Sequence, residues 1–344
     1  MNKDQLHETA CAMVAPGQGI LAMDESTPTC GKRLQSVGVE NSEDNRRAYR
    51  TLLLGTPGLG EFISGAILYD ETIRQNTVDN IPFVELMKKQ EILVGIKVDT
   101  GAKDLALHQG EKITEGLDGL RERLGEYKSM GAQFCKWRAV ITIGKDLPSR
   151  ACIQANAHAL ARYAALCQEA GLVPIVEPEV LLDGDHTIDT CYTVTVETQH
   201  TVFEQLYRQG VYFGGMVLKP SMVLTGKESK QPAGIVPVAE LTLQCLQQTV
   251  PAAVPGIAFL SGGQSDEDAT QHLNAMNVMA KNLSIPWRLT FSYARALQHV
   301  ALDTWQGKKT NVEKARQALL LRARLNALAS DGAYKEEMEH QQAA

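Results

Sequence analysis

Residues 133–180 read QFCKWRAVITIGKDLPSRACIQANAHALARYAALCQEAGLVPIVEPEV and contain the structural unit that recurs along the chain. An apolar, β-rich run at 133–140 is followed by a helical pattern at 152–171 and by a second β-rich run at 172–180. Two adjacent strands joined through a helix run parallel, because the crossover returns the chain to the edge where it started. The stretch therefore predicts a strand–helix–strand unit of a parallel sheet.

The same pattern extends in both directions and gives eight β-rich runs. They are GILAMDE (19–25), ISGAILYDE (63–71), ILVGIKVD (92–99), QFCKWRAV (133–140), LVPIVEPEV (172–180), GMVLKP (215–220), GIAFLSGG (256–263) and RLTFSYAR (288–295). Helical patterns lie between them, for example at 113–130 and 238–250. Eight alternating units predict an α/β fold of the (β/α)8 TIM-barrel type. The alternative is an open doubly wound sheet, which is less favoured because no GxGxxG motif follows the first strand.

We expect residues 1–344 to form a single domain, since barrels of this type run to about 250 residues or more as one unit. Residues 1–17 and 310–344 lie outside the eight units and predict an extra N-terminal helix and a polar C-terminal tail at about 330–344. No internal linker or low-complexity tract divides the chain.

The composition and net charge of the chain bear on which kinds of molecule it could bind. The chain is 44% hydrophobic and 22% charged, with a formal net charge of −6, which gives no general reason to expect binding to nucleic acid or anionic membranes. An anionic substrate would need a local basic cluster. The N-terminus lacks the features of a signal peptide and no run approaches 18 apolar residues, so a cytoplasmic protein is expected, although a removed transit peptide would also fit.

Seven cysteines without a CxxC pair indicate reduced thiols, mostly buried, and leave a redox-sensing pair as the alternative. The eight histidines form no HxxH or HExxH motif, and none lies at a predicted strand end. A zinc-dependent mechanism is therefore disfavoured. No metal or organic cofactor is expected.

Polar residues gather near the carboxyl ends of seven predicted strands. They are Asp24, Lys97, Lys136, Arg138, Glu177, Glu179, Lys219, Ser261 and Ser292. A single charge at a strand end is most often a solvated rim residue, but barrel enzymes carry their chemistry at this end of the strands. Residues two apart on a strand share a face, so Lys136 should converge with Arg138, and Glu177 with Glu179.

Lys219 ends an apolar strand, where burial and a neighbouring cation such as Lys136 would lower its pKa and expose a nucleophilic amine. Such a lysine can form an imine with a carbonyl substrate. Glu177 could carry the protons that imine formation requires, and Asp24 could take a proton from a substrate hydroxyl.

Two regions could bind anions. SGGQSDED (261–268) places two glycines between a strand and a helix start, where free backbone N–H groups form an anion site, and Arg295 opens the next helix. Arg33 and Lys97 supply basic groups elsewhere around the mouth. Two anion sites would suit a substrate phosphorylated at both ends.

The segments GILAMDES, GIKVD, CKWRAV, VPIVEPE, VLKPSM, TFSYARAL and FLSGGQS resemble the class I fructose-bisphosphate aldolases, in order from about residue 10 to residue 332. The resemblance implies that Lys219 forms the Schiff base, that Glu177 is the imine proton shuttle with Glu179 beside it, and that Lys136 and Asp24 are catalytic. It further implies substrate contacts, with one phosphate at Ser261, Gly262 and Arg295, the other end at Ser26, Arg33 and Lys97, and further contacts at Arg138 and Ser292.

Three features depart from the family pattern. Pro28 and Thr29 replace a common glycine and serine, which leaves the shape of the loop near Ser26 open. Ala294 replaces a glycine, so a positive φ there would be costly. The chain ends EEMEHQQAA, without the terminal tyrosine of many animal relatives, and that role is not transferred to Tyr334.

The expected activity is reversible cleavage of fructose 1,6-bisphosphate to dihydroxyacetone phosphate and glyceraldehyde 3-phosphate, and the resemblance implies a homotetramer. Two alternatives remain. An enzyme acting on sedoheptulose 1,7-bisphosphate would use the same residues. A catalytically inactive scaffold on this fold would have lost an acid, a base or the lysine, and all are present.

Overall fold

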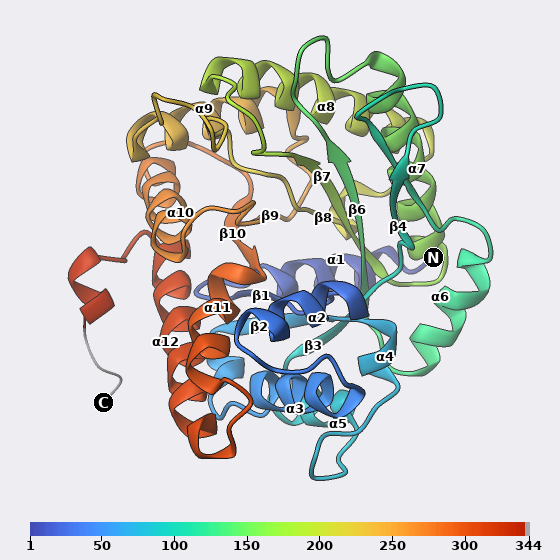
Figure 1. Ribbon diagram of the computed structural model, residues 1–344. Coiled ribbons are helices and arrows are strands. Elements are labelled where there is room, and N and C mark those ends of the chain that lie inside the picture. The colour runs from blue at the N-terminus through green and yellow to red at the C-terminus, as the bar shows by residue number, and fades with distance from the viewer. Residues whose placement is uncertain (341–344) are drawn as a thin grey trace.

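The computed structural model describes residues 1–340, and its centre is a closed barrel of eight parallel strands in the order β1-β10-β9-β8-β7-β6-β3-β2 (Figure 1). The barrel strands are β1 (Gly19–Ala22), β2 (Ile63–Leu68), β3 (Leu93–Lys97), β6 (Phe134–Ile141), β7 (Val173–Val180), β8 (Val217–Leu218), β9 (Gly256–Phe259) and β10 (Arg288–Tyr293). Each lies within one of the eight predicted runs or overlaps it. The predicted TIM barrel is confirmed.

Helices surround the strands on the outside (Figure 1). They are α2 (Thr27–Ser36), α3 (Glu43–Leu54), α4 (Asp70–Ile73), α5 (Phe83–Lys89), α6 (Leu120–Ser129), α7 (Arg150–Glu169), α8 (Ile188–Arg208), α9 (Ile235–Thr249), α10 (Asp266–Ala280), α11 (Arg295–Trp305) and α12 (Val312–Ser330). Short 3-10 turns are η1 (Leu59–Glu61), η2 (Phe213–Gly215), η3 (Lys309–Asn311) and η4 (Glu336–His340). None of the helices within residues 1–340 is long and apolar enough to cross a membrane.

The interior of the barrel is apolar at the end where the strands begin. An ideal Cβ on Gly95 would lie 2.2 Å from the ring of Phe134, so the missing side chain makes room for this phenylalanine. Helix α1 (Lys3–Met13) covers the end where the strands begin, and its Leu6 and Met13 belong to the same apolar cluster as Phe134 and Val173. Inward-facing side chains can therefore reach water only at the carboxyl ends of the strands.

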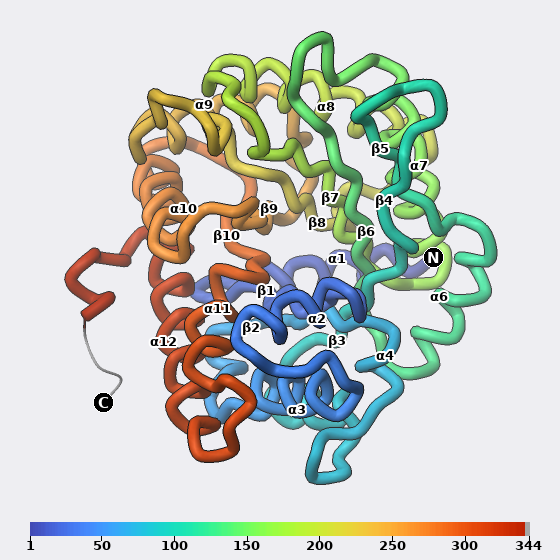
Figure 2. The backbone as a smooth tube through the Cα atoms, viewed as in Figure 1, coloured from blue at the N-terminus to red at the C-terminus, as the bar shows by residue number. Residues whose placement is uncertain are grey.

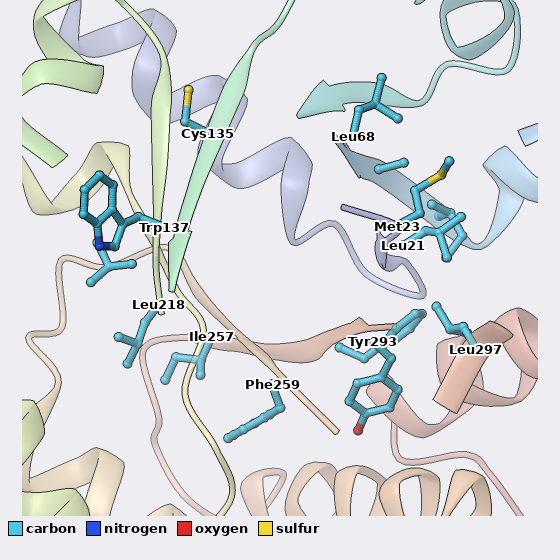
Figure 3. Packing of buried hydrophobic residues seen from close by; sticks show 14 of the residues in the cluster. Leu21, Met23, Leu68, Cys135, Trp137, Leu218, Ile257, Phe259, Tyr293 and Leu297 are labelled. Atoms are coloured by element: carbon cyan, nitrogen blue, oxygen red, sulfur yellow. The ribbon is translucent and has the colours of Figure 1, made fainter. Parts of the chain in front are cut away.

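The outward faces of the strands form the larger core against the helices. Cys135 and Trp137 of β6 and Ile257 and Phe259 of β9 belong to this cluster (Figure 3). They alternate with the inward-facing positions, as a pleated strand requires. This packing fixes the register of each strand, because a slip by one residue would exchange the two faces.

The predicted helix at 113–130 is wrong in its first part. Residues before Leu120 form an antiparallel hairpin of β4 (Gly101–Asp104) and β5 (Lys112–Glu115), which lies beside β6 and α7 (Figure 2). Gly116 and Gly119 have φ values of 126° and 65°, and residues with positive φ cannot belong to a right-handed helix. The helix begins only after them.

The C-terminal segment folds back onto α12. Arg322, which is buried, pairs with Glu339 at 2.5 Å, and the Tyr334 hydroxyl donates to the same carboxylate at 2.9 Å. The predicted polar tail at about 330–344 therefore contains η4 up to His340, and its last four positions, 341–344, lie outside the described residues.

Candidate active site

A cavity of about 580 Å³ opens at the carboxyl ends of the barrel strands. All thirteen residues that the sequence singled out line it. They are Asp24, Ser26, Arg33, Lys97, Lys136, Arg138, Glu177, Glu179, Lys219, Ser261, Gly262, Ser292 and Arg295. The barrel thus brings together side chains that are separated by up to 271 positions, from Asp24 to Arg295.

Lys219 follows β8 directly and is buried in the centre of this cavity, where only 3% of its surface is exposed. Its backbone N–H donates to Val176 at 2.8 Å, which continues the pairing of β8 with β7 and fixes the side chain inward. The Nζ atom lies 3.5 Å from Oε1 of Glu177. Burial lowers the pKa of Lys219, and the cation of Lys136 lowers it further, despite the opposing effect of Glu177.

Lys136 lies between two carboxylates on neighbouring inward-facing positions. Its Nζ donates to Asp24 at 2.9 Å and lies 3.2 Å from Oε2 of Glu177. Burial alone would lower the pKa of Lys136, but Asp24 and Glu177 outweigh it and raise this pKa above its ordinary value. Lys136 therefore stays a cation while Lys219 more readily becomes a neutral amine.

Asp24 is buried as well, and burial alone would raise its pKa. Lys136 and Lys219 together more than compensate, so the pKa of Asp24 falls well below its usual range. The carboxylate is therefore ionised throughout the neutral pH range.

Two further ion pairs line the wall. Arg138 pairs with Glu179 across β6 and β7, so Glu179, although on the same face as Glu177, is held by the arginine. Lys97 pairs with Asp99 at 2.6 Å, and Asp99 also accepts the backbone N–H of Arg138 at 3.3 Å. Sequence reasoning missed Asp99, although it stands two residues after Lys97 at the end of the same predicted run.

The two glycines of the predicted turn adopt left-handed backbone conformations shortly before helix α10. Gly262 and Gly263 adopt φ values of 58° and 98°, and Ser265 then caps α10 by accepting the N–H of Asp268 at 3.0 Å. Arg295 is the first residue of α11 and donates to the carbonyl of Gln264 at 3.3 Å. Ala294 has a φ of −101°, so the alanine causes no left-handed strain.

The turn rests on a buried pair of polar side chains. Gln264 donates to the carbonyl of Ser261 at 3.0 Å, so its Oε1 faces Nδ1 of His272, 2.6 Å away, and accepts the proton. Burial lowers the pKa of His272 to about 4, which keeps the imidazole neutral. The neutral imidazole of His272 therefore orients the side-chain amide of Gln264, and this amide in turn holds the carbonyl of Ser261 in the turn.

The opposite end of the cavity is built on ion pairs. Glu25, which is buried, pairs with Arg33 and with Arg50, the latter at 2.5 Å. Burial tends to raise the pKa of Glu25, but Arg50 and Arg33 lower it overall. Pro28 occupies the first turn of α2, where its missing N–H costs nothing, so the helix starts normally after Ser26.

Five charged residues at or beside the cavity were absent from the sequence-based prediction: Glu25, Arg50, Asp99, Asp183 and Lys227. Glu25 and Asp99 stand at predicted strand ends and could have been found there. Arg50 lies on α3 and Lys227 follows β8 in a loop, and nothing in the local sequence connects either of them to the mouth of the barrel.

All seven cysteines lie within residues 1–340 and are unpaired, six of them buried and Cys11 exposed. Over the same range, no three His, Cys, Asp or Glu side chains are arranged to hold a metal ion. Metal independence stays a prediction, which a chelator can test.

Comparisons with known proteins show the family to which the chain belongs. The family profile described as "Fructose-bisphosphate aldolase class-I" matches residues 5–344. A Xanthomonas campestris protein described as "Probable fructose-bisphosphate aldolase class 1" is 58% identical over 336 residues, covering 97% of this chain and 100% of that relative. A chloroplastic fructose-bisphosphate aldolase of Chlamydomonas reinhardtii is 52% identical over 341 residues, covering 99% of this chain and 89% of the relative.

Among solved structures, the fructose-bisphosphate aldolase of Plasmodium falciparum superimposes with a TM-score of 0.95 at 49% identity, covering 97% of this chain and 96% of that one. Fold, site and relatives together define an aldehyde-lyase built on a TIM barrel. The chain belongs to the class I fructose-bisphosphate aldolase family. Its reaction is the reversible cleavage of fructose 1,6-bisphosphate to dihydroxyacetone phosphate and glyceraldehyde 3-phosphate.

Proposed function

We propose that Lys219 is the nucleophile of this aldolase and that Glu177, Asp24 and Lys136 are its proton-transfer and electrostatic partners. The observation that carries the proposal is the contrast between two buried lysines in one cavity. The pKa of Lys219 is lowered, whereas that of Lys136, between Asp24 and Glu177, is raised. Only Lys219 is prepared to attack a carbonyl.

Imine formation begins when Nζ of Lys219 attacks the C2 ketone and gives a carbinolamine. Its hydroxyl must leave as water and therefore needs a proton. Glu177, whose carboxyl lies 3.5 Å from Nζ, takes the proton that the Lys219 ammonium loses when it becomes the free amine, and passes this proton to the leaving hydroxyl. The resulting protonated imine draws electrons away from C3.

Cleavage follows from the ionised state of Asp24. Its carboxylate takes the C4 hydroxyl proton, the C3–C4 bond breaks, and the electron pair moves into the imine to form an enamine. Glyceraldehyde 3-phosphate leaves. Protonation at C3 restores the imine, and hydrolysis releases dihydroxyacetone phosphate and the free amine of Lys219. The Lys136 cation faces both carboxylates and stabilises their negative charge during these steps.

The two phosphates occupy opposite ends of the cavity. The ketone-side phosphate binds the turn of Ser261 and Gly262 with Arg295, and Ser292 contributes a buried hydroxyl that has no hydrogen-bond partner among the described residues. The aldehyde-side phosphate binds near Ser26, Arg33 and Lys97. Arg138, paired with Glu179, lines the wall between them.

Borohydride trapping tests the nucleophile. Reduction in the presence of dihydroxyacetone phosphate should leave a stable adduct on the peptide that contains Lys219, detected by mass spectrometry, and Lys219→Met should abolish it. Lys136→Met serves as the matched control, because it removes an equally buried lysine but leaves the nucleophile, so an adduct at Lys219 should remain detectable. An adduct on Lys136 or Lys97 instead would contradict the assignment.

The proposal extends to the setting of the enzyme. The relatives include cytosolic and chloroplastic forms, and we assign this chain to the cytoplasm by analogy with the cytosolic form. A homotetramer is the proposed assembly, on the resemblance to the family. Light scattering coupled to size-exclusion chromatography measures the mass directly.

A further inference from the structure

Lys227 projects onto the glycine turn from a loop that the reaction mechanism does not use. An ideal Cβ on Gly263 would lie 2.7 Å from Cε and 2.9 Å from Nζ of Lys227, and 3.5 Å from Nη2 of Arg295. The ammonium group and the guanidinium group therefore approach the same glycine. Both residues line the cavity together with Ser261 and Gly262.

The backbone holds Lys227 firmly in this place. Its N–H donates to Leu182 at 2.8 Å, and the flanking Gly226 and Glu228 donate to His186 and Gly184, each at 2.9 Å. An ideal Cβ on Gly226 would lie 2.2 Å from the carbonyl oxygen of Gly184, so this close approach requires glycine. The loop after β8 is thus fastened to the loop after β7 with Lys227 at the mouth.

The partner of Lys227 is weakly held. Its Nζ pairs with Asp183 at 3.2 Å, but the two side chains are 48% and 67% exposed. Exposed pairs of this kind contribute little to stability, typically about 0 to 1 kcal/mol, so water or another anion can replace the carboxylate at small cost. A phosphate monoester carries about two negative charges near neutral pH, and Arg295 supplies only one positive charge.

We propose that Lys227 is a second cation for the phosphate that binds the glycine turn, and that it exchanges Asp183 for this phosphate when substrate enters. Lys227 then favours ketose 1-phosphates and dihydroxyacetone phosphate over substrates that lack this group. The inference rests on the proposed function, which places the ketone-side phosphate at the turn. Asp183 acts as the competing anion of the empty site.

The condensation reaction separates the two phosphates, because each arrives on its own substrate. Lys227→Met should raise the KM for dihydroxyacetone phosphate by about three- to tenfold, the loss expected for one charge-assisted contact at a partly exposed site. The KM for glyceraldehyde 3-phosphate and kcat should change little. Asp183→Asn should lower the KM for dihydroxyacetone phosphate, since it removes the competitor.

Lys230→Met is the matched control, an exposed lysine on the same loop that does not line the cavity, and Arg295→Ala is the positive control. Equal losses in Lys227→Met and Asp183→Asn would mean that the pair only stabilises the loop, and would overturn the inference. An unchanged KM in Lys227→Met, with a raised one in Arg295→Ala, would overturn it while leaving the proposed function intact. If neither variant altered the KM for dihydroxyacetone phosphate, the phosphate assignment itself would be wrong.

Discussion

The two ends of the active-site cavity hold their basic groups in different ways. At one end, Arg33 pairs with Glu25 and Lys97 with Asp99, and the side chains of both acids are no more than 5% exposed. At the other end, Arg295 donates to a backbone carbonyl and Lys227 pairs with an acid that is mostly exposed. Buried acids hold the cations of the first end, whereas the cations of the second end meet only a backbone carbonyl or an exposed acid.

This difference separates stability from binding. Removing one partner of a buried pair leaves an uncompensated charge in the protein and destabilises the fold. A cation that meets mainly backbone or water can be removed with little effect on folding but with a direct effect on anion binding. Removing a buried acid at the first end should therefore change the free energy of unfolding, whereas removing a cation at the second end should change kinetics with little effect on unfolding.

The largest effect is expected for Glu25→Gln. The amide keeps the shape of the side chain but leaves the guanidinium of Arg50 buried without an anion. We expect a loss of about 3 to 5 kcal/mol in the free energy of unfolding, measured by urea denaturation. Glu40→Gln, an exposed control, should change it by less than about 0.5 kcal/mol. A Glu25 variant as stable as the control would remove the contrast between the ends.

Next in size is the division of the phosphates between two arginines. Arg295→Ala should reduce kcat/KM by about ten- to a hundredfold on both fructose 1,6-bisphosphate and fructose 1-phosphate, since both carry the ketone-side phosphate. Arg33→Ala should be impaired by a similar factor only on the bisphosphate. Steady-state kinetics of both variants on both sugars give the comparison. Equal proportional losses throughout would show that the arginines do not divide the phosphates.

A smaller effect concerns the pH dependence of stability at the turn. The pKa of His272 is about 4 in the folded protein, against an ordinary value of 6.5. Below pH 6.5 this histidine becomes protonated in the unfolded chain but stays neutral in the folded protein. The free energy of unfolding therefore falls as the pH falls towards 4. This group should cost about 1 kcal/mol between pH 7 and pH 5.5.

His272→Asn tests this point, because its amide can still donate to Gln264 but does not titrate. Urea unfolding at the two pH values should show that the variant loses about 1 kcal/mol less than the unaltered protein. An identical loss in both proteins would mean that another group dominates this range.

The smallest expected effect is that of a chelator. Dialysis against EDTA should leave cleavage activity unchanged, because no three His, Cys, Asp or Glu side chains within residues 1–340 are arranged to hold a metal ion. Activity that is lost on dialysis and returns specifically with zinc would contradict this prediction. Magnesium addition serves as the control for non-specific ionic effects.

The amino-acid sequence by itself determined the barrel and the residues around its mouth. Alternating strand and helix patterns are local, and inward positions repeat every two residues, so Lys136 with Arg138 and Glu177 with Glu179 could be assigned to one face. The resemblance to known relatives then attached roles to particular positions. The hairpin at 101–115 was missed because its two strands are only four residues long each and carry no apolar alternation.

Only the tertiary structure decided which charges meet. Sequence spacing does not predict the ion pair of Arg50 with Glu25 or the contact of Lys227 with Gly263, because the closed barrel brings these residues together from different elements of the fold. The same closure gives the two central lysines opposite pKa shifts. Lys136 lies between two carboxylates, whereas Lys219 lies against one carboxylate and one cation. The pKa of an ionisable group depends on its burial and on the charges within a few ångströms. Neither can be read from a local stretch of sequence.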